Sequence, residues 1–185
     1  MKIHLKILLS ASMFFALSEG FLGPIYAIFV KEIGGDLIAT GISWSIFMII
    51  SGVGMIIIGK LTDLLKKEEL MLTIGFFFTT IGTLGYLFIS NKYELFIIQI
   101  IFGIGNAINW PAYDSLYTKS LEKGKFAFQW SMCESVYLIF GGIGALIGGI
   151  IATLYGFKTL FMTMFILCVF GLLASLQLLI KSNKR

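Results

Sequence analysis

Three carboxylic acids lie within long apolar runs of this sequence. Glu19 is near the middle of the first run, Asp114 near the end of the fourth, and Glu134 in the first third of the fifth. An ionisable side chain costs several kcal/mol in hydrocarbon, so it usually faces water or the interior of a helix bundle. Burial also favours the neutral form of a carboxyl group, which brings its proton exchange closer to neutral pH. These positions therefore indicate a path for a proton or a polar solute.

Polar and aromatic side chains accompany two of these acids at helical spacing, on the first and fourth runs. The candidate solute and proton pathway, which we call the seam, consists of Glu19, Tyr26, Asn106, Asn109, Trp110, Tyr113, Glu134 and Tyr137. The alternative is that the same groups hold the helices together through hydrogen bonds. The third and sixth runs carry no charge in their interiors, so we expect them to face lipid.

No other residues indicate catalytic or metal chemistry. Cys133 and Cys168 lie in apolar runs, and His4, the single histidine, has no partner nearby in sequence. Neither a metal-ligand spacing nor a nucleophile motif is present. The sequence therefore predicts that the chain is not an enzyme and has neither a metal site nor a cofactor.

The elements that carry the seam must cross a membrane. The 185 residues have a mean hydropathy of +0.95 and are 13% charged, whereas soluble domains are about 25% charged. This composition excludes a soluble globular domain, a nucleic-acid-binding protein and a disordered chain. A membrane helix needs about 20 mostly apolar residues. We predict an all-α, multi-pass protein with a single domain over 1–185 and six spans, at about 7–30, 37–58, 70–90, 94–117, 128–153 and 159–180.

The basic residues between the spans are distributed unequally. With six spans, eleven of the 14 Lys and Arg residues fall on the side of the two termini, and Lys31, Lys92 and Lys158 fall on the other. Basic residues concentrate on the cytoplasmic side. We therefore expect a cytoplasmic-membrane protein with both termini in the cytoplasm.

The two halves of the chain resemble each other. The Pro-x-Tyr at Pro24 recurs 87 residues later at Pro111, and the Trp-Ser at Trp44 recurs 86 residues later at Trp130. Three spans are an odd number, so the second set of three must be inverted in the membrane relative to the first. The predicted arrangement is a 3+3 inverted repeat, which is typical of transporters.

Four short motifs, in order along the chain, resemble those of one transporter family. Residues 59–67 read GKLTDLLKK and are similar to the loop motif G-x-L-a-D-r-x-G-r-k of the major facilitator superfamily. Residues 95–105 resemble its L-x-x-x-R-x-x-x-G-x-G, with Gln99 in place of the arginine. Residues 144–149 read GALIGG, close to the G-P-x-x-G-G of the family's drug antiporters, and 156–158 read GFK, close to G-[WF]-[RK].

The resemblance covers the N-terminal six-helix half of a twelve-helix architecture. It implies a charge cluster at the cytoplasmic end, which we call the latch residues: Gly59, Asp63, Lys67 and Asp114. It also implies a half-size secondary transporter that moves a small-molecule substrate by alternating access, with proton-coupled efflux of an amphipathic compound as the specific hypothesis. The alternative is a truncated or orphan half without transport of its own, acting as an accessory or assembly subunit.

The expected partners follow from the polar seam. In a lone half, the seam would face the lipid bilayer, which cannot satisfy its polar groups. We therefore expect a parallel homodimer or pairing with a second six-span chain. No nucleic acid is expected as a partner.

Overall fold

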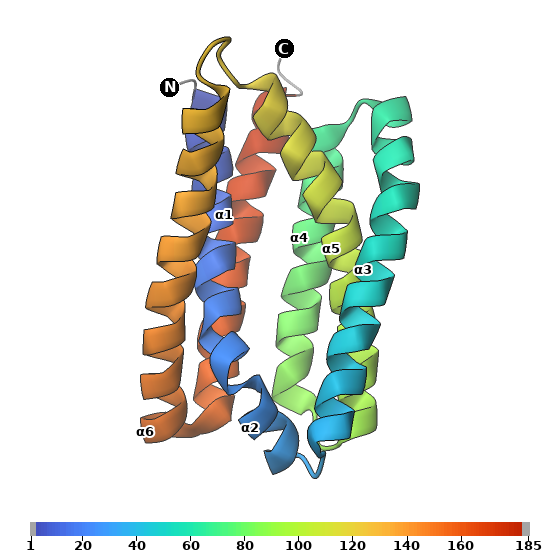
Figure 1. Ribbon diagram of the computed structural model, residues 1–185, viewed down its shortest axis with the longest axis vertical. Helices are drawn as coiled ribbons and strands as arrows, with labels where there is room; N and C mark the ends of the chain where they lie inside the picture. Colours follow the sequence, from blue (N-terminus) through green and yellow to red (C-terminus); the bar gives the residue numbers. More distant parts are fainter. Residues whose placement is uncertain (1–2, 183–185) are drawn as a thin grey trace.

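The protein is a bundle of long helices. The computed structural model describes residues 3–182, and all regular elements in that range are helical. They are α1 (Ile3–Leu22), η1 (Gly23–Ile25), α2 (Tyr26–Glu32), α3 (Leu37–Leu65), α4 (Glu68–Gly85), η2 (Tyr86–Phe88), α5 (Lys92–Lys119) and α6 (Phe126–Ser182). The long helices run along a common axis, and both ends of the chain lie at the same end of the bundle (Figure 1). The all-α class predicted from the sequence is confirmed.

Five helical stretches among residues 3–182 are long and apolar enough to cross a membrane. One of them, α6, has 57 residues and would be roughly 85 Å long if straight, against a hydrocarbon core of about 30 Å. Its backbone is non-helical at Gly156 (φ 79°, ψ 171°), and the chain turns back there (Figure 1). We call 126–155 and 157–182 the first and second limbs of α6. The membrane class is thus supported, while the count of six spans and the inverted repeat stay predictions.

The helices extend beyond the apolar runs because their ends are capped. The Asp36 side chain accepts a hydrogen bond from the Ala39 backbone N–H at 2.7 Å and starts α3 at Leu37. α3 ends at Leu65 and is capped by Lys66, which has a left-handed backbone (φ 51°). We predicted an end near residue 58, where the apolar run stops. The backbone continues as a helix for about two more turns because its hydrogen bonds do not depend on apolar side chains.

Glycines let α1 and the first limb of α6 approach closely. A Cβ atom at Gly20 would collide with the carbonyl oxygen of Gly141, and Cβ atoms at Gly144 and Gly148 would collide with the carbonyl oxygens of Leu17 and Phe21. Small residues at such an interface are typical of membrane helices, which associate through close packing. This packing fixes α1, and with it Glu19, against α6.

The other helices pack as a second group. α3 and α4 lie against α5, and α4 also contacts α6. The Thr80 hydroxyl donates to the Cys168 carbonyl at 3.4 Å across this last contact. α4 therefore joins the two groups through the second limb of α6.

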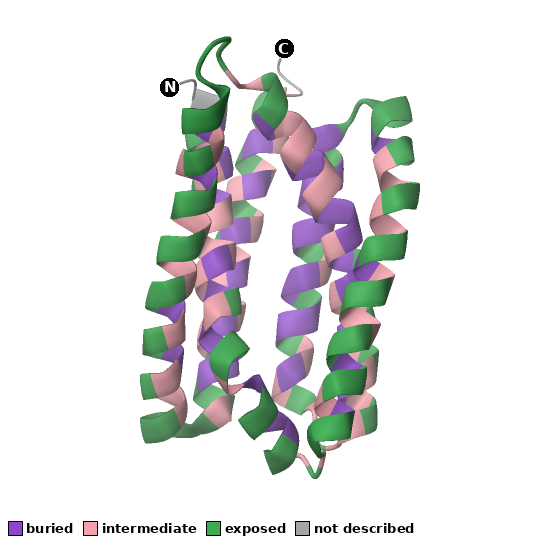
Figure 2. Cartoon of the chain, viewed as in Figure 1, coloured by how far each residue is buried: buried purple, intermediate pink, exposed green. Residues whose placement is uncertain are grey.

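Burial differs strongly between these helices. In the most apolar 18-residue stretch of each candidate span, 56% of the α4 residues are buried but only 11% of the α3 residues. Figure 2 shows many exposed residues along α3 and along the first limb of α6. We expected the third and sixth spans to face lipid. They expose an outer face, with Phe77 and Phe170 each about half exposed, but their inner faces are core. Small hydroxyl and sulfur side chains pack these inner faces together without any charge. That the outer faces contact lipid stays a prediction.

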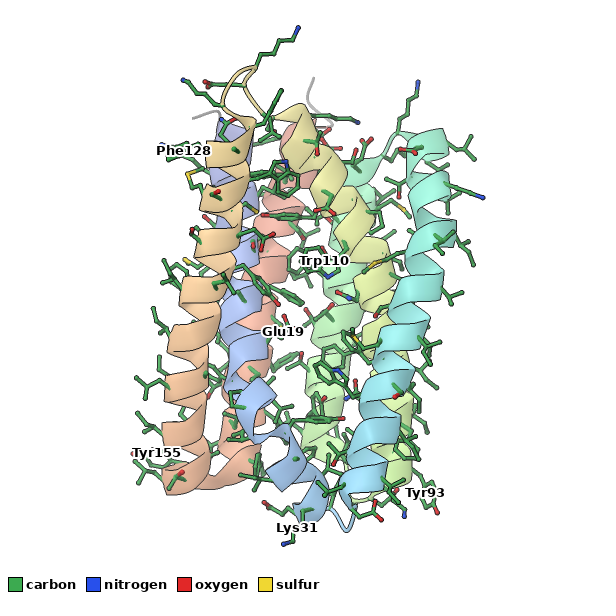
Figure 3. The ribbon with its side chains drawn as sticks, in the orientation of Figure 1. Glu19, Lys31, Tyr93, Trp110, Phe128 and Tyr155 are labelled. Carbon is green, nitrogen blue, oxygen red and sulfur yellow. The ribbon has the colours of Figure 1, made fainter. Side chains whose placement is uncertain are left out.

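The basic residues gather where the sequence predicted them. The end of α3, the loop before α4 and the turn between α5 and α6 lie at the same end as the chain termini. Lys31 lies at the opposite end, as do Tyr93 and Tyr155 on other helices (Figure 3). The assignment of the lysine-rich end to the cytoplasm stays a prediction.

Candidate functional site

A pocket lies between α1, α3, α4, α5 and the second limb of α6. Its volume is about 680 Å³, including the space that opens from it. It is lined by Phe15, Ser18, Glu19, Leu22, Gly23, Tyr26, Trp44, Phe47, Thr79, Thr83, Tyr86, Gln99, Phe102, Asn106, Met164 and Cys168. Three seam residues, namely Glu19, Tyr26 and Asn106, are thus brought to one pocket.

Glu19 is the acidic group of this pocket. The Tyr137 hydroxyl donates a hydrogen bond to its Oε2 atom at 2.6 Å, linking α1 to the first limb of α6. Figure 3 shows Glu19 near the middle of the bundle, far from Lys31 and Phe128 at the two ends. Glu19 is nevertheless classed as exposed on the surface formed by residues 3–182. The carboxyl group is therefore accessible at a depth where lipid or another helix bundle would surround the protein.

A hydrogen-bonded network closes the other end of the pocket. Gln99, which is 3% exposed, donates from Nε2 to the Tyr26 hydroxyl at 2.6 Å and to the Tyr86 hydroxyl at 3.1 Å. The Tyr26 hydroxyl in turn donates to Ser43 at 2.7 Å. Tyr86 and Ser43 were not predicted as site residues. The signal available in the sequence was Gln99, a polar side chain in an apolar run that needs partners when buried.

The amide residues of α5 have different surroundings. Asn106 lines the pocket and donates to the Ser51 hydroxyl of α3 at 3.4 Å. Asn109 is buried, and its backbone lies against Gly75 of α4. Asn109 is therefore packed between helices and does not line the pocket, in line with the alternative that some seam residues hold helices together.

The remaining aromatic residues of the seam adjoin the pocket on the side of the chain termini. Trp110 lies 6.3 Å from the Tyr137 ring and 6.5 Å from the Tyr113 ring, measured between ring centroids. The Tyr113 hydroxyl contacts the Cys133 sulfur at 3.2 Å. Trp110 and Glu19 both contact Tyr137, which therefore links these rings to the acid.

Two further acids lie beyond these rings. Glu134 is exposed on the first limb of α6, and Asp114 is half-buried on α5. The two are close enough for their negative charges to repel each other. Neither acid lines the pocket.

No ion pair joins the latch residues to one another within residues 3–182, and their role stays a prediction. Within residues 3–182, Asp63 and Lys67 are exposed and take part in no ion pair, and Gly59 lies on α3. An ion pair at this end joins Glu68 of α4 to Lys119 of α5 at 2.5 Å, with the Glu68 side chain 9% exposed. Sequence reasoning missed this pair because its partners are 51 residues apart.

No metal site is formed by the part of the chain that the structure describes. No group of three His, Cys, Asp or Glu side chains between residues 3 and 182 can hold a metal ion. Cys133 and Cys168 are free and buried. His4 lies outside the residues whose side chains are described.

Comparison with known proteins decides the family. Residues 8–184 match the family model of the Major Facilitator Superfamily. The chain belongs to this superfamily. Its members are transporters rather than enzymes, which confirms that the chain is not an enzyme.

A relative from Methanocaldococcus jannaschii supports the assignment. This protein is described as an uncharacterized MFS-type transporter and is 31% identical over 142 residues. The alignment covers 77% of this chain and 36% of the relative. The chain thus spans about a third of the length of the curated relative that it matches.

Proposed function

We propose that the chain is one six-helix unit of a secondary transporter that moves a small solute across the cytoplasmic membrane by alternating access. The observation that carries this proposal is the pocket at mid-height, which is lined by Glu19, an acid that is exposed on the part of the chain that the structure describes. A transporter of this superfamily needs such a polar site near the middle of the membrane, at the interface between its repeats.

The proposal counts the two limbs of α6 as separate spans. The limbs at 126–155 and 157–182 are each long enough to cross roughly 30 Å of hydrocarbon. Six crossings place both termini and the lysine-rich loops on one side, and the excess of lysines supports the cytoplasmic assignment.

Equivalent helix contacts support a 3+3 inverted repeat. A Cβ atom at Gly20 would meet Gly141, where α1 packs on the first limb of α6. The positions 87 residues after Gly20 and 87 residues before Gly141 are Ala107 and Gly54. These two residues also meet closely, where α5 packs on α3. The contact between α1 and α6 and the contact between α3 and α5 are therefore made at equivalent positions of the two three-helix sets. An inverted repeat requires such matching contacts.

The seam defines the proposed path. Glu19 carries the proton, and the solute occupies the pocket between Glu19 and Gln99. The aromatic walls of the pocket favour an amphipathic compound, and we propose that it is exported in exchange for protons. The latch residues form no ion pair with one another among residues 3–182, and in this proposal they form their cluster in another conformation of the cycle.

The open face requires a partner. Glu19 is exposed and Asn106 is half-buried on this face, and lipid cannot satisfy either group. The two halves of a complete transporter of this type are related by an axis along the membrane normal. A second copy of the chain, or a companion six-span chain, therefore fits the face in the same orientation.

Export of fluorescent dyes tests the function. The chain is expressed in cells that are loaded with ethidium (a cation), Nile red (neutral) or 8-anilinonaphthalene-1-sulfonate (an anion), and dye loss is compared with cells that lack the chain. We expect faster loss of at least one dye, reversal of the effect by Glu19→Gln, and no change with Glu32→Gln, which removes the same charge at an exposed site. If none of the dyes leaves faster, or if Glu19→Gln exports as well as the wild type, the proposal fails. An inactive chain is the outcome that the accessory-subunit alternative predicts.

A further inference from the structure

We propose that the pocket selects a monovalent, hydrophobic organic cation. This inference rests on the proposed function, since it names the class of solute that the same pocket takes. It follows from the sign of the charge, the chemistry of the walls and the number of acids.

The sign of the charge is set by Glu19. Among the side chains that line the pocket, Glu19 is the one acid, and no basic side chain lies beside it there. The lysines of the described chain lie toward the two ends of the bundle, and none lines the pocket. A carboxylate without a nearby cation attracts a positive solute and repels a negative one, most strongly where water is scarce.

One carboxylate oxygen is available to the solute. Tyr137 donates its hydrogen bond to Oε2. Within residues 3–182 no protein group donates to the other oxygen, Oε1. Tyr137 therefore holds one oxygen of the Glu19 carboxylate and leaves the other able to accept from a solute in the pocket that Glu19 lines.

The walls next to this acid are aromatic. The Trp44 ring lies 5.9 Å from the Tyr26 ring and 5.5 Å from the Phe47 ring, between centroids, so three rings form one wall. Phe15 and Phe102 also line the pocket. Aromatic faces attract cations through their negative π surfaces and pack well against apolar bodies.

The number of acids limits the charge of the solute. Glu134 and Asp114 lie outside the lining of the pocket. At the far end, Gln99 uses its amide to hold the hydroxyls of Tyr26 and Tyr86, so this end is polar but uncharged. A second positive charge there would be desolvated without a counter-charge, which is costly. The pocket therefore favours one charge over two.

Two probes of nearly the same shape and opposite charge test the inference. Equilibrium binding of radiolabelled tetraphenylphosphonium and tetraphenylborate is measured on the full chain in lipid nanodiscs, with the signal of empty nanodiscs subtracted. We expect the cation to bind at least about tenfold more tightly than the anion. Equal affinities, or tighter binding of the anion, would overturn the inference without the use of any variant.

Variants then locate the site. We expect Glu19→Gln to weaken binding of the cation at least about tenfold without weakening that of the anion, and Glu32→Gln to leave both within about twofold. Trp44→Ala, which removes part of the wall and keeps the charge, should also weaken cation binding. If neither Glu19→Gln nor Trp44→Ala changes the affinity for the cation, the pocket is not the site and the inference is wrong.

The two proposals fail in different ways. Export of a neutral or anionic dye combined with no binding of tetraphenylphosphonium would overturn the inference and leave the transport function intact. Tight, Glu19-dependent binding of tetraphenylphosphonium without export of any dye would overturn the transport function and support the assigned chemistry of the pocket.

Discussion

Replacement of Gly148 by alanine should loosen the packing of α1 on α6. A Cβ atom at Gly148 would lie 2.5 Å from the Phe21 Cα and 2.7 Å from its carbonyl carbon. Carbon atoms in contact prefer about 3.5–4.0 Å, so the two helices must separate by about 1 Å. Overpacking of this kind typically costs about 1–3 kcal/mol. The neighbouring Gly149 has no atom within 4 Å of such a Cβ and serves as a matched control.

The comparison isolates the clash because both substitutions gain the same helix propensity, up to about 1 kcal/mol. Unfolding by sodium dodecyl sulfate in lipid bicelles, followed by circular dichroism, gives the free energy of unfolding of each variant. We expect Gly148→Ala to be less stable than Gly149→Ala by about 1–3 kcal/mol. Equal stabilities would refute the close α1–α6 contact, and with it the position of Glu19 relative to Tyr137.

Three further predictions concern orientation, assembly and the lysine-rich end. In a background without Cys133 and Cys168, a cysteine in place of Lys123 should react with a membrane-impermeant thiol reagent in inside-out vesicles; reaction in intact cells would contradict the cytoplasmic assignment. A cysteine in place of Asn106 on the open face should form crosslinks to a partner chain in native membranes, whereas one in place of the outward-facing Phe77 should not; a monomer in both cases would count against pairing through the seam. A double-mutant cycle on Glu68→Gln and Lys119→Gln should give a coupling of about 1 kcal/mol, because Lys119 is largely exposed; zero coupling would show that the ion pair does not stabilise this end.

The apolar runs predicted the helices well but not their breaks. The two Pro-x-Tyr sequences differ in backbone structure, since the chain is a 3₁₀ helix at Pro24 and a continuous α-helix through Pro111. Gly23 directly precedes Pro24, and glycine weakens a helix by about 1 kcal/mol relative to alanine. Trp110 and Ala112 flank Pro111 instead. Whether the α-helix is interrupted at the proline therefore depends on the adjacent residues. The Pro-x-Tyr motif does not include the residue before the proline.

The pocket was only partly predictable for a related reason. Glu19, Tyr26 and Asn106 were recognised because a polar group in an apolar run needs an explanation. Thr79 and Thr83 also line the pocket, but each donates to a carbonyl one turn earlier in its own helix, at 3.0 Å and 2.9 Å. Such internal hydrogen bonds let threonine lie in an apolar helix without a partner elsewhere. For this reason, the participation of α4 in the wall of the pocket could not be predicted from these threonines.

Accessibility of the pocket from both sides of the membrane tests alternating access most directly. Asn106 lines the pocket, so a cysteine is placed there in a background without Cys133 and Cys168, with Phe77→Cys as the outward-facing control. Membrane-impermeant thiol reagents are applied to right-side-out and to inside-out vesicles. We predict labelling of position 106 from both sides and of position 77 from neither. Labelling of position 106 from one side alone, or from neither side, would contradict the account.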